Sequence, residues 1–307
     1  MNRREFIKIT GGITAIFTFP EVILAGTRVT VSKAAARASI IWLQGQSCSG
    51  DSVSLLNSED PDIASLITNH VSLNFHQTIS IATGDTAIDI LLKTIKEQRK
   101  DYILVFEGSL PKKSQIFCTI GEVNNKPVGA SEWLTLLAKN AKAVVACGTC
   151  AAYGCIPAAK VRSQQQNPTN STSIWEFLKD TKIKKRINIP GCPAHPDWVI
   201  GTLIHLIMNK RIKLDEYGRP LIYFKKTVHD RCEHLEEYKK EIFANNWGEK
   251  GCLYKLGCLG IDTHCDIPMR KWLKVNSCTK CGGGCIGCTE PPFPDYGNRG
   301  IFPTTKA

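Results

Sequence analysis

The feature that most constrains this chain is its set of fourteen cysteines, many of which stand beside a glycine or in pairs separated by two residues. Cysteines can form disulfides, but clustering at these spacings is typical of metal ligands. Thiolates are soft donors that suit the iron of iron–sulfur clusters, and neighbouring glycines allow backbone amides to approach the cluster sulfurs. The chain has 307 residues, more than an average domain, so we expect two cores, one of them held together largely by metal.

The N-terminal segment has the pattern of a cleavable export signal. Arg3 and Arg4 lie in a charged segment, and an apolar stretch from Ile9 to Phe19 follows that is too short to span a bilayer. Small residues suited to processing come next, at Ala34, Ala35, Ala36 and Ala38. We predict that residues 1–36 are a twin-arginine signal peptide and that the mature chain is periplasmic. The alternative is a basic disordered tail with an accidental arginine pair.

No later segment offers an uninterrupted membrane span. The most apolar stretch, Val199 to Met208, contains Thr202 and His205 and is better explained as a core helix. We therefore expect a protein that is soluble or peripherally associated with a membrane. About +7 of the formal net charge of +11 remains after the signal, and no basic run is interleaved with aromatic residues, so we predict no nucleic-acid binding.

Residues 39–208 alternate short apolar runs with amphipathic stretches, which predicts an α/β fold with a parallel sheet covered by helices. The expected strands are Ser39–Leu43, Val71–Phe75, Tyr102–Phe106, Ala143–Ala146 and Arg186–Ile189. The expected helices lie near Ile63–Thr68, Thr86–Lys96, Ser131–Lys139 and Ile174–Lys179.

The cysteines of this part follow the expected strands. Cys48 comes after the first strand, Cys150 after the fourth and Cys192 after the fifth, each on a turn that contains glycine. The carboxyl ends of parallel strands meet at one edge of the sheet, so we expect these three to form one site, with Asp51 and Cys155 beside it. Buried structural cysteines are the alternative, and they are the better explanation of Cys118 and Cys147.

The chain changes character after about Leu214, where glycine and proline become frequent and eight cysteines follow. His229 and Cys232 lie on one helical face and, with Cys252 and Cys258, give either an iron–sulfur site or a zinc site of one His and three Cys. The spacing of these residues favours neither the iron–sulfur site nor the zinc site. Farther along, the run Cys278, Cys281, Cys285 and Cys288, with Cys265 upstream, is too compact for a zinc ribbon and resembles a ferredoxin-like motif.

These motifs together resemble, in order, those of NiFe-hydrogenase small subunits of the periplasmic uptake type. The matching segments are 42–50, 107–111, 118–121, 148–151, 190–196, 229–232, 252–258 and 285–291. The resemblance implies a flavodoxin-like domain, residues 37–213, with a proximal cluster. It also implies a smaller irregular domain, residues 214–307, with a medial cluster and a surface distal cluster. The nickel–iron site would lie in a separate large subunit, with which this chain would form a heterodimer.

On that resemblance, the chain is the electron-transfer subunit of a hydrogen:acceptor oxidoreductase. It would relay electrons from hydrogen oxidation through three iron–sulfur clusters to a cytochrome or another acceptor near the distal cluster. The alternatives are the cluster subunit of a related quinone-reducing complex and an exported binding protein stapled by disulfides or zinc.

The chain departs from the family at the proximal cluster. Family members usually have Cys-x-x-Cys in the first loop, whereas here Asp51 stands in the second position, and Cys155 replaces a more usual glycine. We predict that Cys48, Cys150 and Cys192 hold the proximal 4Fe-4S cluster with Asp51 as the fourth ligand and Cys155 as the alternative. A carboxylate is a harder donor to this iron than a thiolate.

The resemblance assigns the other ligands as well. The distal 4Fe-4S cluster would be held by His229, Cys232, Cys252 and Cys258. The medial cluster would be held by Cys265, Cys278, Cys285 and Cys288, with Cys281 as the alternative to Cys278. Family medial clusters are often 3Fe-4S centres with a proline at the vacant corner. Because Cys278 falls near that position, we predict a 4Fe-4S medial cluster here.

Overall fold

The computed structural model describes residues 21–24, 27–30, 38–97, 99–159 and 167–295. The chain divides into two compact units, residues 1–36 and residues 37–307. In the first unit, β1 (Glu21–Leu24) and β2 (Thr27–Thr30) form an antiparallel hairpin. The arginine pair, the apolar stretch and the small residues before residue 37 that carry the predicted signal lie outside the described residues, so the signal peptide stays a prediction. The boundary after residue 213 also stays a prediction.

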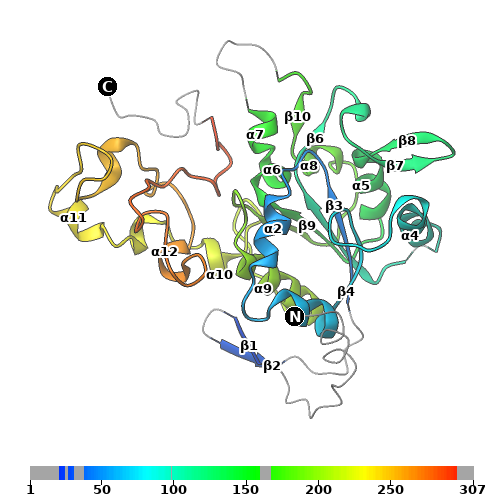
Figure 1. Ribbon diagram of the computed structural model, residues 1–307, viewed down its shortest axis with the longest axis horizontal. Coiled ribbons are helices and arrows are strands. Elements are labelled where there is room, and N and C mark those ends of the chain that lie inside the picture. Colours follow the sequence, from blue (N-terminus) through cyan, green and yellow to red (C-terminus); the bar gives the residue numbers. More distant parts are fainter. Residues whose placement is uncertain (1–20, 25–26, 31–37, 98, 160–166, 296–307) are drawn as a thin grey trace, which may run out of the picture. The chain divides into compact units, whose positions relative to one another are not determined.

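A five-stranded parallel sheet forms the centre of the second unit (Figure 1). Its strands are β3 (Ala38–Gln44), β4 (Val71–His76), β5 (Tyr102–Glu107), β9 (Ala143–Cys147) and β11 (Arg186–Ile189). The spatial order is β4-β3-β5-β9-β11, and every neighbouring pair is parallel. This is the flavodoxin-like order, in which the direction of winding reverses between the first and third strands. The predicted α/β class and all five predicted strands are confirmed.

Helices cover both faces of the sheet (Figure 1). One face carries α4 (Gly84–Lys96), α5 (Ala130–Ala138) and α8 (Ile174–Phe177), close to their predicted positions. Along the other face α2 (Gly50–Leu56) packs against α9 (Pro196–Ile207), the core helix expected from its apolar sequence. The predicted helix near residue 63 is α3 (Ile63–Ser65) followed by a π-helical turn, η1 (Leu66–His70).

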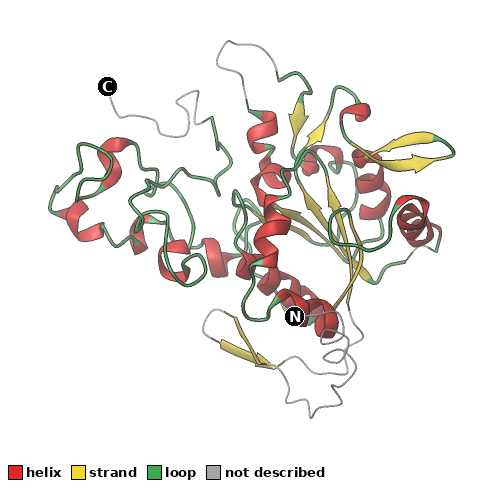
Figure 2. Cartoon of the chain, in the orientation of Figure 1, coloured by secondary structure: helices red, strands yellow, loops and turns green. Residues whose placement is uncertain are grey.

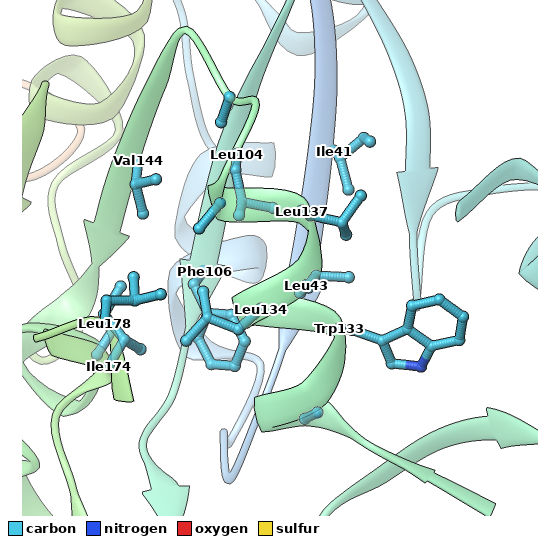
Figure 3. Close-up of a cluster of buried hydrophobic side chains, with 14 of the residues drawn as sticks. Ile41, Leu43, Leu104, Phe106, Trp133, Leu134, Leu137, Val144, Ile174 and Leu178 are labelled. Carbon is cyan, nitrogen blue, oxygen red and sulfur yellow. The ribbon is translucent and has the colours of Figure 1, made fainter. Parts of the chain in front are cut away.

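One hydrophobic core lies between the sheet and α4, α5 and α8 (Figure 3). Strand side chains alternate between the two faces, so Ile41 and Leu43 enter this core while Ile40 and Trp42 are buried on the opposite face. Both faces of the strands are therefore apolar, as expected for a parallel sheet covered on both sides.

Two small antiparallel strand pairs were not predicted. Strands β6 (Leu110–Pro111) and β10 (Ser171–Thr172) pair antiparallel. Strands β7 (Thr119–Val123) and β8 (Lys126–Gly129) form a hairpin that packs on α4. The hairpin docks on the core through the indole N–H of Trp133, which donates to the carbonyl of Ile120 at 2.8 Å.

Residues 214–295 consist mainly of loops and short helices (Figure 2). The helices are α10 (Leu221–Phe224), η3 (His229–Arg231), α11 (Leu235–Lys239), η4 (Leu253–Leu256) and α12 (Ile267–Arg270). The buried Arg219 ties this part together, because its guanidinium bonds Asp215 at 2.7 Å and Glu290 at 2.9 Å. Within the described ranges, no helix has the length and apolar character needed to cross a membrane.

Candidate metal centres

The first group of thiols lies where the winding of the sheet reverses. Cys48 is in the loop after β3, and the short helix α6 (Gly148–Tyr153), which follows β9, carries Cys150. Cys155 begins the next helix, α7 (Cys155–Ala158), and Cys192 follows β11. Ligands bind in this crevice in sheets of this type. We call Cys48, Cys150, Cys155 and Cys192 the proximal group.

The thiols of the proximal group are close neighbours. The Cys155 sulfur is within hydrogen-bond reach of both Cys150 and Cys192. As a donor, the Cys155 thiol lowers the pKa of Cys192 to about 7. The thiol of Cys48 is near enough to interact electrostatically with Cys192, Cys150 and Asp51, although burial is the main cause of its raised pKa. Three of these four were predicted as ligands from the sequence, and the fourth as the alternative.

Asp51 packs beside the proximal group and faces Gly148, the first residue of α6. Its carboxylate accepts a hydrogen bond from the main-chain N–H of Ala194 at 2.6 Å. Gly148 has a φ of +80°, and a Cβ added there would lie 2.0 Å from an Asp51 carboxylate oxygen. Only glycine therefore fits at this position. Burial, followed by repulsion from Glu107, raises the pKa of Asp51 well above its usual range.

Glu107 fixes the loop that carries Cys48. This carboxylate at the end of β5 is fully buried. It accepts hydrogen bonds from Trp42 Nε1 at 3.1 Å, Gln44 Nε2 at 3.2 Å, Ser47 Oγ at 2.8 Å, Asp51 N at 3.1 Å and Ser52 Oγ. Five donors more than fill the four or so lone-pair sites of a carboxylate, so the side chain is fully hydrogen-bonded although it is removed from water. Three of the five belong to residues 47–52, so the carboxylate holds both sides of Cys48.

A second group lines one recess in the C-terminal part. His229, Cys232, Cys252 and Cys258 all line one small recess that is partly open to solvent. We call these four residues the distal group. The His229 ring is held edge-on against Tyr238, with 4.4 Å between ring centroids. Each of the four was predicted as a ligand of one site, and the structure brings them together.

The third group consists of Cys265, Cys278, Cys285 and Cys288, which we call the medial group. Cys288 interacts electrostatically with Cys278, Cys285 and Cys265. Burial raises the pKa of Cys288 to about 12 and raises those of Cys265 and Cys285 as well. Cys281 interacts with Cys278, and its thiol donates to the Cys278 carbonyl at 3.1 Å. Cys278 is thus the link between Cys281 and the group.

The remaining two cysteines fit structural roles. Cys147 is the fully buried last residue of β9, and Asp51 and Glu107 are the charged groups that influence it. Cys118 is half-buried before β7, and burial raises its pKa to about 11. A high pKa keeps a thiol protonated and unreactive at neutral pH.

The donor sets fit iron–sulfur clusters. All fourteen cysteines are free thiols. Burial raises the pKa of thiols in all three groups, among them Cys48, Cys232 and Cys265, so these thiols stay protonated unless a bound cation takes the place of the proton. Among the described residues, no three His, Cys, Asp or Glu side chains converge on one ion. A cluster bonds each ligand through a different iron, so its ligands stand farther apart than those of a single zinc ion.

Several residues near the sulfurs were not singled out from the sequence. The side chains of Thr279, Thr263 and Trp272 lie beside the sulfurs of Cys232, Cys285 and Cys278 and lower the pKa of these thiols. The hydroxyl of Thr149, beside Cys150, donates to the Cys288 carbonyl. Such donors orient ligands and tune a cluster. Only Thr149 had a sequence signal, its place inside the Gly-Thr-Cys motif.

Comparisons with known proteins match almost the whole chain. A family profile described as NADH ubiquinone oxidoreductase, 20 Kd subunit, matches residues 48–206, and a profile for the C-terminal part of NiFe/NiFeSe hydrogenase small subunits matches residues 224–299. The periplasmic NiFeSe hydrogenase small subunit of Desulfomicrobium baculatum is 36% identical over 310 residues, with 96% of each chain covered. The periplasmic NiFe hydrogenase small subunit 1 of Nitratidesulfovibrio vulgaris is 34% identical, covering 96% of this chain and 91% of that protein.

Solved structures give the same result for the fold. The reduced, active NiFeSe hydrogenase from Desulfomicrobium baculatum matches with a TM-score of 0.80 and 37% identity, covering 87% of this chain and 99% of that one. The actinobacterial-type NiFe-hydrogenase from Ralstonia eutropha H16 matches with a TM-score of 0.81 and 33% identity, covering 90% and 84%.

Proposed function

The chain belongs to the family of nickel–iron hydrogenase small subunits, and from that premise we propose that it carries electrons through three iron–sulfur clusters between a large hydrogenase subunit and an outside acceptor. The observation that supports the proposal most is the gathering of distant cysteines into three separate groups. When bound, the clusters supply one-electron redox chemistry. The protein supplies the thiolates, the hydrogen bonds to sulfur and the exclusion of water.

We propose Cys48, Cys150 and Cys192 as ligands of the proximal 4Fe-4S cluster, with Asp51 as the fourth ligand and Cys155 as its alternative. The Asp51 carboxylate lies near enough to this group to raise the pKa of Cys48, and the Cys155 thiol is within hydrogen-bond reach of Cys150 and Cys192. The site thus has a hard and a soft candidate for one corner. Asp51→Cys and Cys155→Gly variants test the assignment by EPR. A changed proximal signal in one variant identifies the ligand, and unchanged signals in both contradict the proposal.

We propose a four-iron medial cluster held by Cys265, Cys278, Cys285 and Cys288. The electrostatic contact between Cys278 and Cys288 supports Cys278 over Cys281 as the fourth ligand. Cys278→Ser is expected to give a three-iron EPR signal in the oxidised protein, while Cys281→Ser leaves the spectrum unchanged. A three-iron signal in the oxidised wild-type protein would contradict the four-iron assignment.

For the distal group we propose a 4Fe-4S cluster with His229 as one ligand beside Cys232, Cys252 and Cys258. The recess that these four side chains line together supports one metal centre shared by all of them. One neutral imidazole among thiolates makes a cluster less negative, which suits an exit point for electrons near the surface. The partner at this end would be a cytochrome or another electron acceptor.

The whole proposal is tested by purifying the chain with its partner from the periplasmic fraction. We expect co-purification with a nickel-containing large subunit, about twelve iron atoms with matching acid-labile sulfide per small subunit from three four-iron clusters, and hydrogen-dependent reduction of a viologen dye. The names of the periplasmic relatives support this location and partner. A colourless protein that contains zinc or disulfides and no labile sulfide would overturn the proposal.

A further inference from the structure

Neighbouring ligand groups are joined by hydrogen bonds of one kind. The main-chain N–H of Cys192, in the proximal group, lies close enough to the sulfur of Cys288, in the medial group, to lower its pKa. The main-chain N–H of Cys285, in the medial group, donates to the sulfur of Cys258 in the distal group, with 3.2 Å between nitrogen and sulfur. In both links a ligand residue of one group touches a ligand sulfur of the next directly. The connection from sulfur to sulfur needs three covalent bonds and one hydrogen bond.

The hydroxyl of Thr149 holds the first link in place. It accepts from the main-chain N–H of Gly191 at 2.8 Å and donates to the main-chain carbonyl of Cys288. The main-chain N–H of Thr149 also donates to the Gly191 carbonyl at 3.0 Å. The side chain is buried, with 1% exposed. Thr149 therefore fixes the residue before Cys192 against Cys288 and sets how closely the two approach.

The second link is reciprocal. While the Cys285 N–H donates to Cys258, the main-chain N–H of Leu259 donates back to the Cys285 carbonyl at 2.8 Å. The buried hydroxyl of Thr263 lies between the two chain segments of this link. It donates to the Leu259 carbonyl at 2.7 Å and lies beside the Cys285 sulfur. Thr263 occupies the same structural role here as Thr149 does in the first link.

We propose that these two N–H···S contacts are the paths by which electrons move between the clusters, and that Thr149 and Thr263 are the positioning residues that keep them short. The inference rests on the proposed function of the chain. Each step moves one electron. The cluster that gives up the electron is oxidised, the next cluster in the chain is reduced, and the amide nitrogen of the link keeps its proton. Electrons from hydrogen would reach the medial cluster at Cys288 and leave it at Cys285.

The direction of each hydrogen bond suits this role. An N–H aimed at a ligand sulfur stabilises the additional negative charge of a reduced cluster. The Cys192 N–H therefore favours the electron on the medial cluster, and the Cys285 N–H favours it on the distal cluster.

Thr149→Val in the purified heterodimer tests the first link. Valine keeps the shape of the side chain and removes its hydroxyl. With hydrogen as the reductant, freeze-quench EPR follows the appearance of the reduced medial cluster. We expect its formation to slow by roughly tenfold, at the lower end of the effect of removing a residue that orients a metal ligand. We also expect a lower medial reduction potential, full cluster content and recovery in Thr149→Ser. Thr135→Val is the matched control, because that hydroxyl bonds only the Ser131 carbonyl within α5.

Thr263→Val tests the second link in the same way, and there the reduced distal cluster should form more slowly. If a variant with full cluster content transfers electrons at the wild-type rate and potential, its link is not the path and the inference fails. If Thr149→Val loses its clusters, two other variants still test the inference. Thr149→Ser must reduce the medial cluster at the wild-type rate, and Thr263→Val must reduce the distal cluster more slowly than the wild type. Absence of iron and labile sulfide from the wild-type heterodimer would instead refute the proposed function.

Discussion

Glu107 shows how much of the proximal site depends on one residue outside the ligand set. Its five donors all point at carboxylate oxygens, so an amide in its place would turn one acceptor into a donor that faces other donors. We expect Glu107→Gln to lower the free energy of unfolding by about 2–3 kcal/mol. Thermal and denaturant unfolding, followed by the visible absorbance of the clusters, measures the loss. Glu132→Gln, at an exposed position on α5, is the control, and equal stability of the two variants would contradict this role for Glu107.

His76 gives the same region a dependence on pH. Its ring, 1% exposed, contacts the Ser52 hydroxyl at 3.1 Å, and burial lowers its pKa to about 4 against the attraction of Glu107. The folded state therefore binds this proton more weakly than the unfolded state, whose His pKa is near 6.5. The stability is complete above pH 6.5 and is lost as the pH falls from there toward 4.

Between pH 7 and pH 5 we expect His76 to account for about 2 kcal/mol of lost stability. Denaturant unfolding of the wild type and of His76→Gln across this range measures its share. The free energy of unfolding of His76→Gln should change less with pH than that of the wild type. Parallel profiles for the two proteins would assign the pH dependence to other groups.

At the scale of elements, the start of α6 depends on the close approach of its first residue, Gly148, to the Asp51 carboxylate. Gly148 and Gly84 each begin a helix with positive φ, +80° and +55°. A methyl group at Gly148 would overlap Asp51, whereas nothing lies within 4 Å of one at Gly84. We expect Gly84→Ala to cost about 1 kcal/mol in backbone strain. Gly148→Ala should cost roughly 3 kcal/mol or more, because overpacking adds to the strain.

Thermal unfolding of the two variants, with EPR of the proximal cluster, separates these effects. The proximal signal should change only in Gly148→Ala, because the shifted helix carries Cys150. Equal unfolding midpoints and unchanged EPR spectra in the two variants would show that the start of α6 can shift to accommodate the added methyl group.

The elements differ in how far the sequence predicts them. The five sheet strands are short buried apolar runs, so composition alone located them to within a residue or two. The helix α2 was missed because Gly50–Leu56 is short and begins with Gly, Asp and Ser, which are poor helix formers. The β7–β8 hairpin was missed although its sequence signal is present: Asn124 and Asn125 are adjacent asparagines, which favour a hairpin turn. In the structure both have positive φ, as such a turn requires. Thr149 and Glu107 act through partners distant in sequence, and local patterns do not reveal such partners.

For the molecule as a whole, the sheet part and the cluster part have different sources of stability. The sheet lies between two layers of helices and buries a large core, including Leu104, Trp133 and Leu137. Residues 214–295 instead form short helices and loops near the medial and distal groups, and their buried residues include the thiols of Cys252, Cys265 and Cys285. Metal binding supplies folding free energy where a core is small. We therefore propose that residues 214–307 form a metal-dependent folding unit distinct from residues 37–213.

Removal of the clusters tests this division. After treatment of the purified complex with an oxidant and an iron chelator, hydrogen–deuterium exchange should show fast exchange for amides such as Leu259 and Cys285, whose bonds join the medial and distal groups. Amides of β5 and β9 should keep slow exchange, because their partners are strands inside the apolar core. The sheet amides are the internal control within one sample. If protection were lost to the same extent in both parts, the chain would fold as a single cooperative unit and the clusters would support all of it. If neither part lost protection, residues 214–295 would be stable through Arg219 and their other polar contacts alone.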